Sequence, residues 1–147
     1  MHDNNLWQYC GKLFTSTDAE EKISDGFLGF IYKITDISSG RKYIGKKLLV
    51  QKIKLAPLKG SKRKRTKIRQ SDWEKYYGSS EMVKELVAIR PHDFTREILS
   101  FCRSKGELNY AESALQFELG VLLSDDYFNG IINCRINKSH VKSLWKS

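Results

Sequence analysis

The sequence is poor in the residues that build disulfide frameworks and metal clusters. Its 147 residues include only three cysteines and three histidines. The cysteines, Cys10, Cys102 and Cys134, are odd in number, lie far apart and form no C-x-x-C pair. This pattern indicates neither a disulfide framework nor a structural zinc site. We therefore expect reduced thiols that are mostly buried.

Long apolar runs are also missing. No stretch approaches the ~20 apolar residues of a transmembrane helix, and the first residues, MHDNNLWQYCGK, lack the charged-then-apolar order of a secretory signal. We expect a soluble, intracellular protein that is neither secreted nor bound to a membrane. The length and the 40% apolar content suit one globular domain with a real core. We place that domain at residues 26–147, with residues 1–25 as an N-terminal arm packed on it.

Acidic residues are absent from residues 41 to 69, although this stretch holds 13 of the 26 lysines and arginines. The net charge of +9 is therefore concentrated in one strip, which favours a polyanion as the partner. The segment KGSKRKRTKIRQ is polar all round, whereas a helix that binds a membrane surface places apolar side chains opposite its cations. We predict a basic loop over residues 52–70 that contacts nucleic acid. The alternative is a solvated loop whose lysines only keep the protein soluble.

A β-hairpin is predicted at residues 29–47, GFIYKITDISSGRKYIGKK, where two β-branched and aromatic runs flank an SSG turn. Alternate side chains of an antiparallel pair share a face, so Tyr32 and Tyr43 can lie close together on one surface. Lys46 and Lys47 follow Gly45, close after the second tyrosine. Two phenols beside two cations suit phosphate chemistry. The alternative is that both tyrosines are ordinary strand residues.

The remaining pattern predicts helices around a small sheet. SDWEKYYGSS indicates a short helical turn, and a helix follows from Ser79 or Ser80 until Pro91 ends it. FTREILSF, residues 94–101, alternates as a third strand. The fold expected from these elements is α+β, with a small three-stranded antiparallel sheet flanked by helices.

The last predicted helix, from Ser104 to about Leu123, carries a carboxylate on its apolar face. Ser104 and Glu107 have the spacing of a capping box. The apolar stripe that follows consists of Leu108, Ala111, Leu115, Leu119 and Leu122. Glu112 lies on this stripe, where a carboxylate is costly unless a cation or a metal ion satisfies it. The alternative is that Glu112 lies at the edge of the stripe and pairs with a surface lysine.

These features together resemble the GIY-YIG nuclease superfamily. FIY at residues 30–32 stands for GIY, YIG at residues 43–45 is intact, and ten residues separate the two triplets. The resemblance covers about residues 26–135, and phage-encoded free-standing members are the most similar. It implies the GIY-YIG nuclease fold and a divalent-metal-dependent endonuclease that hydrolyses DNA phosphodiester bonds. For a phage-encoded protein, the expected location is the cytoplasm of the host cell.

The resemblance also implies roles for the residues singled out above. Tyr32 would activate the attacking water, Tyr43 would help to hold the scissile phosphate, and Glu112 would ligate a single Mg²⁺ or Mn²⁺. Because a free phenol has a pKa of about 10, Tyr32 can act as a base only where cations favour the phenolate. Lys46 and Lys47 are placed to do so. The hypothesis requires an accessible ring at Tyr32 and a nearby carboxylate at Glu112.

Several assignments depart from the family pattern. Arg69 is the first candidate for the family arginine, and Arg63 and Arg65 are the next candidates. Tyr76 takes the place of a family histidine. The family asparagine is Asn129 or Asn133, and we favour Asn129 because an aromatic residue precedes it. The residues expected to contact DNA are Lys47, Lys62, Arg63, Lys64, Arg65, Lys67 and Asn129.

Two other functions are compatible with the sequence. One is a DNA-binding module of the same fold that does not cleave, and the other is an assembly protein whose basic loop binds an acidic partner. No small-molecule organic cofactor is expected. The sequence leaves oligomeric state and cleavage specificity open.

Overall fold

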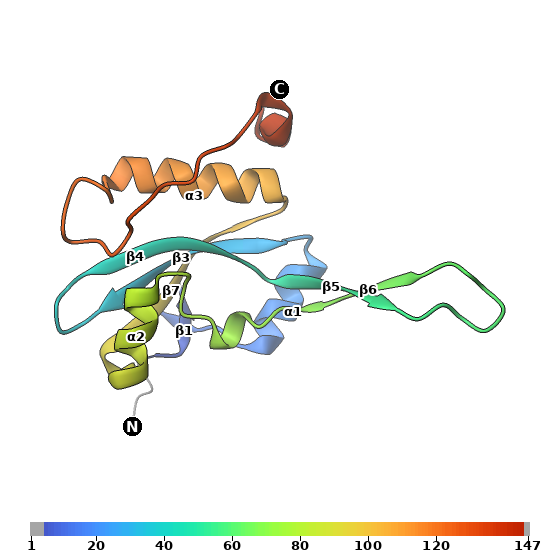
Figure 1. The fold of residues 1–147 in the computed structure, drawn as a ribbon, viewed down its shortest axis with the longest axis horizontal. Helices are drawn as coiled ribbons and strands as arrows, with labels where there is room; N and C mark the ends of the chain where they lie inside the picture. The colour runs from blue at the N-terminus through green and yellow to red at the C-terminus, as the bar shows by residue number, and fades with distance from the viewer. Residues whose placement is uncertain (1–4, 146–147) are drawn as a thin grey trace.

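The computed structural model describes residues 5–145 and has an α+β architecture (Figure 1). A five-stranded sheet with the order β2-β1-β7-β3-β4 forms its centre. The strands of this sheet are β1 Trp7–Tyr9, β2 Lys12–Leu13, β3 Gly29–Asp36, β4 Lys42–Leu48 and β7 Phe94–Cys102. Helix α3, Lys105–Leu119, lies on one face of the sheet, and α1, Ser16–Ser24, and α2, Glu81–Ile89, lie on the other. Short 3-10 helices complete the fold: η1 Trp73–Lys75, η2 Pro91–Asp93 and η3 Lys138–Leu144.

The α+β class and the antiparallel hairpin are confirmed, but the expected number of three strands was wrong. The two additional strands come from the N-terminal segment, where β1 pairs in parallel with β7 and antiparallel with β2. With three and two residues, these strands are too short to show a period-2 pattern in the sequence. They form because β7 offers a free edge next to which Trp7 is buried. Residues 1–4 of the expected arm lie outside the described residues.

The β3–β4 hairpin separates two hydrophobic cores. Tyr32 is paired with Gly45, and Ile34 is paired with Tyr43. Alternation along the strands turns one set of side chains toward the core that contains Trp73 and Val83, below the sheet in Figure 1. The other set packs under α3, with Ile31 and Ile44 against Leu108 and Val121. Strand β4 is therefore an edge strand with a core on each side.

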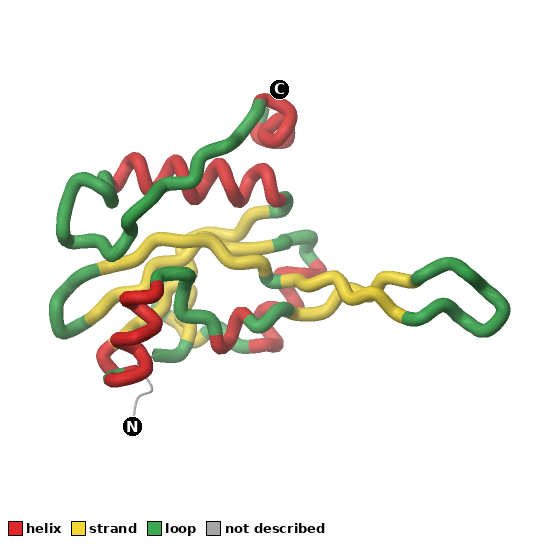
Figure 2. The backbone as a smooth tube through the Cα atoms, in the orientation of Figure 1, coloured by secondary structure: helices red, strands yellow, loops and turns green. Residues whose placement is uncertain are grey.

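The basic segment forms a two-stranded ribbon where we expected a loop over residues 52–70. Its strands are β5 Val50–Leu55 and β6 Arg65–Gln70, which pair antiparallel and leave a loop only at residues 56–64. The reason is that both runs contain β-branched residues, Val50 and Ile53 in the first and Thr66 and Ile68 in the second. Figure 2 shows that this ribbon projects away from the body of the protein.

The helix ends follow local sequence signals. Ser80 caps α2 and Ser104 caps α3, where the Ser104 Oγ accepts a hydrogen bond from the Glu107 amide at 3.1 Å. Helix α3 ends at Leu119, earlier than expected, because Gly120 adopts a left-handed conformation with φ of 62°. No helix in the described part of the chain has the length and apolar character that crossing a membrane requires. Only one of the three free cysteines, Cys102, is buried, so most thiols are exposed and that expectation was wrong.

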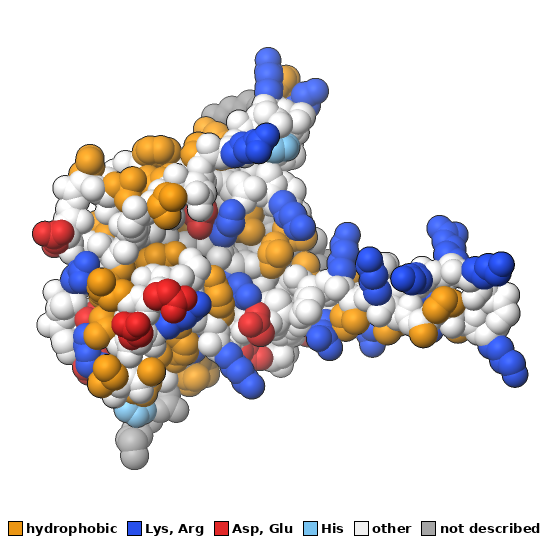
Figure 3. All heavy atoms as spheres, in the orientation of Figure 1, with side chains coloured by type: hydrophobic (Ala, Val, Ile, Leu, Met, Phe, Trp, Pro, Cys, Tyr) orange, Lys and Arg blue, Asp and Glu red, His pale blue; other side chains and the backbone are white. Residues whose placement is uncertain are grey.

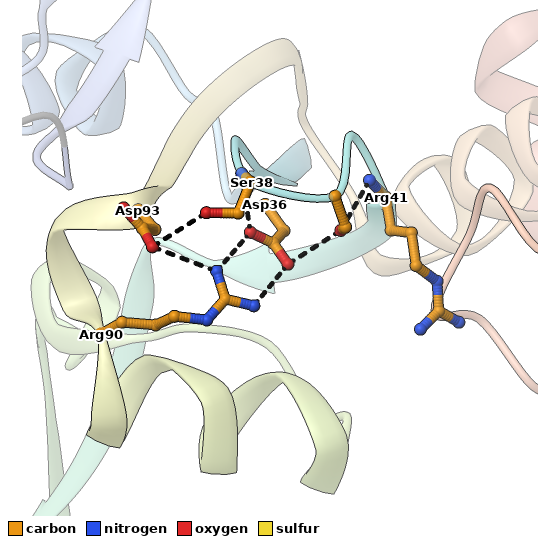
Figure 4. A network of polar contacts seen from close by, with 6 residues as sticks. Asp36, Ser38, Arg41, Arg90 and Asp93 are labelled. Carbon is orange, nitrogen blue, oxygen red and sulfur yellow. Dashed lines mark hydrogen bonds and ion pairs between the residues drawn. The ribbon is translucent and has the colours of Figure 1, made fainter.

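A buried carboxylate ties the β3–β4 turn to the end of α2. Asp36, which is 1% exposed, accepts hydrogen bonds from both Nη atoms of Arg90, at 2.6 and 2.7 Å (Figure 4). The Ser39 hydroxyl donates to the same carboxylate at 2.8 Å. These contacts, led by the hydrogen bond from Arg90, lower the pKa of Asp36 to about 2. The network fixes the orientation of α2 relative to the hairpin that carries both tyrosines.

The isosteric substitution Asp36→Asn is expected to lower the free energy of unfolding by about 2 kcal/mol at neutral pH, because it removes charge-assisted hydrogen bonds. The pKa of Asp36 is depressed in the folded state, so its stabilisation is complete above the ordinary aspartate pKa and is lost as pH falls through about 2. Urea denaturation between pH 7 and pH 2 measures the difference between the two proteins. Lys84→Ala, which removes an exposed ion pair with Glu81, is the control and should change stability little. A difference that stays constant with pH would contradict this prediction.

Candidate active site

A small polar cavity of about 200 Å³ lies beside strand β4. The segment after α3 borders this strand, since the Lys42 amide donates to the Asp126 carbonyl at 2.8 Å and the Phe128 amide donates to the Lys42 carbonyl at 2.7 Å. The cavity is lined by Tyr32, Tyr43, Lys46, Ser79, Glu112, Gln116, Ile131 and Asn133. Five of the residues that the sequence singled out, from β3, β4, α3 and the segment after α3, therefore meet at one place.

The two tyrosines lie on the same face of the hairpin with ring centroids 6.2 Å apart. The Tyr43 hydroxyl shares a 2.7 Å hydrogen bond with the Ser79 hydroxyl, just before α2. The Tyr32 ring packs edge-on against Trp7 and Tyr76, with centroids 5.6 and 5.9 Å away. Tyr32 is thus a core residue and a cavity residue at once.

Gly45 lets Tyr32 reach the cavity. A Cβ atom at Gly45 would lie 2.6 Å from the Tyr32 Cζ, closer than real Cβ contacts come. Because Tyr32 is cross-strand from Gly45, its ring lies against the backbone of β4 where a side chain would otherwise stand. Gly78, with φ of 90°, also approaches Tyr32, because a Cβ atom at Gly78 would lie 3.2 Å from the Tyr32 hydroxyl. The glycine of the YIG triplet is therefore required sterically, because any side chain at this position would overlap the Tyr32 ring.

The Tyr32 ring is 1% exposed, which contradicts the accessible ring that we expected. The physical reason is that the ring packs among Trp7, Tyr43 and Tyr76 in the hydrophobic core on that face of the sheet. Burial raises the pKa of Tyr32 well above its ordinary value, and the nearby Tyr76, Tyr43 and Glu112 add to this effect. The Tyr32 hydroxyl is therefore protonated at neutral pH in the metal-free protein.

Glu112 and Lys46 form the charged pair of the cavity. Lys46 Nζ lies 3.6 Å from Glu112 Oε1, and the Glu112 side chain is 14% exposed. Lys46 also donates a hydrogen bond to the Asn109 side chain. Burial raises the pKa of Glu112, and Lys46 opposes that shift. The lysine that satisfies Glu112 is thus the cation that follows the YIG triplet, not an unrelated surface residue.

The oxygen atoms around Glu112 suit a hard divalent cation. No group of three or more His, Cys, Asp and Glu side chains occurs among residues 5–145, so any metal here relies on few protein ligands. Gln116, one helical turn after Glu112, donates through Nε2 to the Ile44 carbonyl at 3.0 Å. Since a carbonyl can only accept, the Gln116 Oε1 atom is the free end of the amide, and it is buried without a hydrogen-bond partner. A carboxylate and an amide oxygen beside an open cavity fit Mg²⁺ or Mn²⁺.

The two candidate asparagines have different places. Asn129, which we favoured for DNA contact, is buried and brackets the backbone of Ile44. Its Oδ1 accepts from the Ile44 amide at 3.0 Å, and its Nδ2 donates to the Ile44 carbonyl at 2.8 Å. The side chain replaces a neighbouring strand along β4, so it is not available to DNA. Asn133, the other candidate, lines the cavity.

The structure separates several predicted residues from the cavity. Arg69 is exposed on β6, opposite Gln51 of the ribbon, and no arginine is among the described residues that line the cavity. Lys47 lies on the opposite face of β4 from Lys46, because adjacent strand residues alternate. Its Nζ pairs with Asp72 at 2.6 Å and lies 4.2 Å from the centre of the Tyr76 ring. Lys46 is therefore the cation of the cavity.

The remaining predicted cations lie out on the ribbon, and Tyr76 lies beneath Tyr32. Exposed positions in the loop or on β6 are occupied by Lys62, Arg63, Lys64, Arg65 and Lys67. Tyr76, expected in place of a histidine, does not line the cavity but packs on the Tyr32 ring, and burial raises its pKa. Tyr76 therefore acts on the site through its packing against the Tyr32 ring.

Sequence reasoning missed three cavity residues, the polar Ser79 and Gln116 and the apolar Ile131. Gln116 could have been found, because it lies four residues after Glu112 and therefore on the same side of the helix. Ser79 gave no signal beyond its place before a predicted helix, since its contact with Tyr43 spans 36 residues of sequence.

Gly45→Ala is expected to destabilise the protein by about 1 to 3 kcal/mol, because the new methyl group overlaps the Tyr32 ring. The cost should largely disappear when the substitution is made in a Tyr32→Ala background, where the overlapping ring is gone. Chemical denaturation of the four proteins of this double-mutant cycle gives the coupling. Gly130→Ala is the control, since no atom lies within 4 Å of its Cβ position. Equal costs with and without the Tyr32 ring would show that the overlap is not the cause.

A family model matches most of this chain. A family model described as "Putative endonuclease segE, GIY-YIG domain" matches residues 7–132. The match begins within the N-terminal strands, so it extends beyond the stretch in which we recognised the resemblance. No match to the chain was found among curated proteins or among solved structures. Because the matched stretch spans most of the chain and carries Tyr32, Tyr43, Lys46 and Glu112, the chain belongs to the family of GIY-YIG endonuclease domains described for segE.

Proposed function

We propose that this protein is a metal-dependent endonuclease that hydrolyses phosphodiester bonds of DNA at the cavity beside β4. The observation that carries the proposal is the convergence of Tyr32, Tyr43, Lys46 and Glu112 on one polar cavity in a chain of the GIY-YIG family. Phenols, an ammonium group and a carboxylate are the groups that hold a phosphate, move a proton and attract a divalent cation.

Tyr43 and Lys46 are proposed to hold the scissile phosphate. The Tyr43 hydroxyl is fixed by Ser79 at 2.7 Å, and it can donate to a phosphate oxygen while Ser79 donates to it. The Lys46 ammonium carries three donors and engages Asn109 and Glu112 in the free protein. A phosphate in the cavity would therefore find one oriented hydroxyl and one positive charge.

Tyr32 is proposed to bind the attacking water through its hydroxyl. Its burial has two consequences, since the ring cannot turn away and the hydroxyl is neutral in the free protein. A neutral phenol orients a water molecule by hydrogen bonding. It can accept the proton of that water only as the phenolate, after its own proton has passed to solvent, and a reduction of the surrounding negative charge, to which Glu112 contributes, favours the phenolate.

Glu112 and Gln116 are proposed to hold the divalent cation, Mg²⁺ or Mn²⁺. Glu112 supplies the charged oxygen and Gln116 supplies the amide oxygen that has no partner. When bound, such a cation supplies a Lewis acid that stabilises charge on the phosphate and on the leaving oxygen. Gln116 keeps its own orientation through its hydrogen bond to the Ile44 carbonyl.

A DNA-binding module that does not cleave is the second candidate function. The burial of the Tyr32 ring favours it, because a base that stays protonated cannot activate water. The two functions share the fold and the basic ribbon and differ only in what the cavity does with a bound phosphate.

Nicking of supercoiled plasmid in the presence of Mg²⁺ separates these functions. Tyr32→Phe, which keeps the buried ring, and Glu112→Gln are each expected to reduce the nicking rate by about 10²- to 10⁴-fold. Tyr110→Phe and Glu118→Gln are the matched controls, since both residues are exposed on α3 and do not line the cavity. An intact plasmid with every protein, together with tight DNA binding, would support the binding module.

Binding of Mn²⁺, followed by electron paramagnetic resonance, tests the metal ligands without cleavage. Gln116→Met keeps the length of the side chain and should weaken Mn²⁺ binding by about tenfold, whereas Glu112→Gln should weaken it further. Affinity should also fall as the pH is lowered through the raised pKa of Glu112, because a carboxylate must lose its proton to bind. Gln51→Met, on the exposed ribbon, is the control. Unchanged affinity in Gln116→Met would remove Gln116 from the ligand set.

A further inference from the structure

The β5–β6 ribbon stands out from the core and is exposed along most of its length. Residues 56–69 are exposed throughout, and the ribbon is anchored mainly at its base, where the Ser71 amide donates to the Leu49 carbonyl at 2.8 Å. Gln70 donates to the Ser16 carbonyl at 2.9 Å at the same end. A two-stranded hairpin is marginally stable in water by itself. A surface of this kind is expected to gain stability from a partner.

The ribbon carries positive charge on both of its faces. Strand pairing places Gln51, Ile53 and Leu55 of β5 opposite Arg69, Lys67 and Arg65 of β6, so these six side chains share one face. The other face carries Lys52 and Lys54 of β5, opposite Ile68 and Thr66 of β6. A ribbon with cations on both faces suits a site with negative walls on two sides. A membrane surface would need one apolar face instead.

None of this charge is neutralised within the described residues. Residues 50–70 contain nine lysines and arginines and no acidic residue. No ion pair of the described chain involves any of the nine, although Arg65 donates to the Ala56 carbonyl at 3.3 Å. Figure 3 shows lysine and arginine side chains spread along the projecting arm. The partner must therefore supply the negative charge.

We propose that the β5–β6 ribbon inserts into the major groove of double-stranded DNA, with the cations of its two faces on the phosphates of the two groove walls. The strands of a ribbon lie about 4.8 Å apart, and the major groove is about 12 Å wide and admits such a ribbon. Six paired residues extend about 20 Å, enough to follow the groove. This inference rests on the proposed function only for the choice of DNA as the polyanion.

The base of the ribbon links this surface to the active site. A second cavity, of about 940 Å³, lies there and is lined in part by Lys47, Lys52, Arg103 and Lys105. Only Leu49 separates β4, which carries Tyr43 and Lys46, from the first residue of β5. A duplex held by the ribbon is thus held at a fixed distance from the cavity beside β4. The ribbon sets where along the duplex the phosphate backbone enters the cavity.

Two sets of substitutions, one for each face, test the insertion. The first set is Arg65→Gln, Lys67→Gln and Arg69→Gln, and the second is Lys52→Gln and Lys54→Gln. Duplex binding is measured over a range of KCl concentrations in EDTA with Glu112→Gln as the background, so that no cleavage enters the measurement. Each phosphate contact adds about 0.9 to the slope of log affinity against log salt concentration. We expect the slope to fall by about 2.7 for the first set and about 1.8 for the second.

The double substitution Lys138→Gln and Lys142→Gln in η3 is the matched control. It removes two exposed cations that lie outside the ribbon. The slope should equal that of the Glu112→Gln background protein. Circular dichroism melting checks that the exposed substitutions do not unfold the protein. A slope that changes for one face only would show that the ribbon lies on a flat surface, and a slope that changes for neither would overturn the proposal.

The groove itself is tested by two further measurements with the same protein. Bound ribbon should protect guanine N7, which faces the major groove, from methylation. Duplex RNA of the same sequence should bind more weakly and respond little to either set, because its major groove is too narrow to enter. Guanine N7 that stays unprotected would overturn the insertion. Duplex RNA or polyglutamate that binds as tightly as the DNA duplex would also overturn it. Plasmid nicking by the unsubstituted protein, lost in Glu112→Gln, would still support the endonuclease, so the two proposals fail separately.

Discussion

The contact between the Tyr32 ring and the backbone at Gly45 is the constraint on which the site depends. Tyr32 comes from β3, which is covered by a strand on each side, so its hydroxyl reaches the cavity only by passing β4. Gly45 leaves the space for that passage. The same contact brings the tyrosine within reach of Glu112 and Lys46, which belong to the side of the sheet covered by α3. A side chain at position 45 would divide the site in two.

Strand β4 organises the functional surface along the chain. Its residues Tyr43 and Lys46 line the cavity, and its backbone at Ile44 is held by the side chains of Asn129 and Gln116. The chain then continues through Leu49 into the ribbon. One continuous stretch therefore carries the groups proposed to bind phosphate and the charged arm, while α3 supplies the carboxylate. This arrangement couples the place where DNA is held to the place where it is proposed to be cut.

Burial and chemistry act against each other inside the cavity. Burial raises the pKa of both Tyr32 and Glu112, so it opposes the ionisation of both groups. Lys46 is the positive charge that opposes this effect at Glu112. The ion pair between Lys46 and Glu112 thus offsets part of the cost of burying the carboxylate.

The sequence by itself determined the hairpin, the helix with Glu112 and the concentration of positive charge, because period-2 alternation, helical spacing and a lack of acids are local properties. It also singled out Tyr32, Tyr43, Lys46 and Glu112, which the structure brings together at one cavity. Only the tertiary structure decided that Asn129 is a backbone bracket, that Arg69 lies outside the cavity and that the basic segment is a ribbon. Those outcomes depend on contacts between residues far apart in sequence, such as the 85 residues between Ile44 and Asn129, and local patterns carry no information about them.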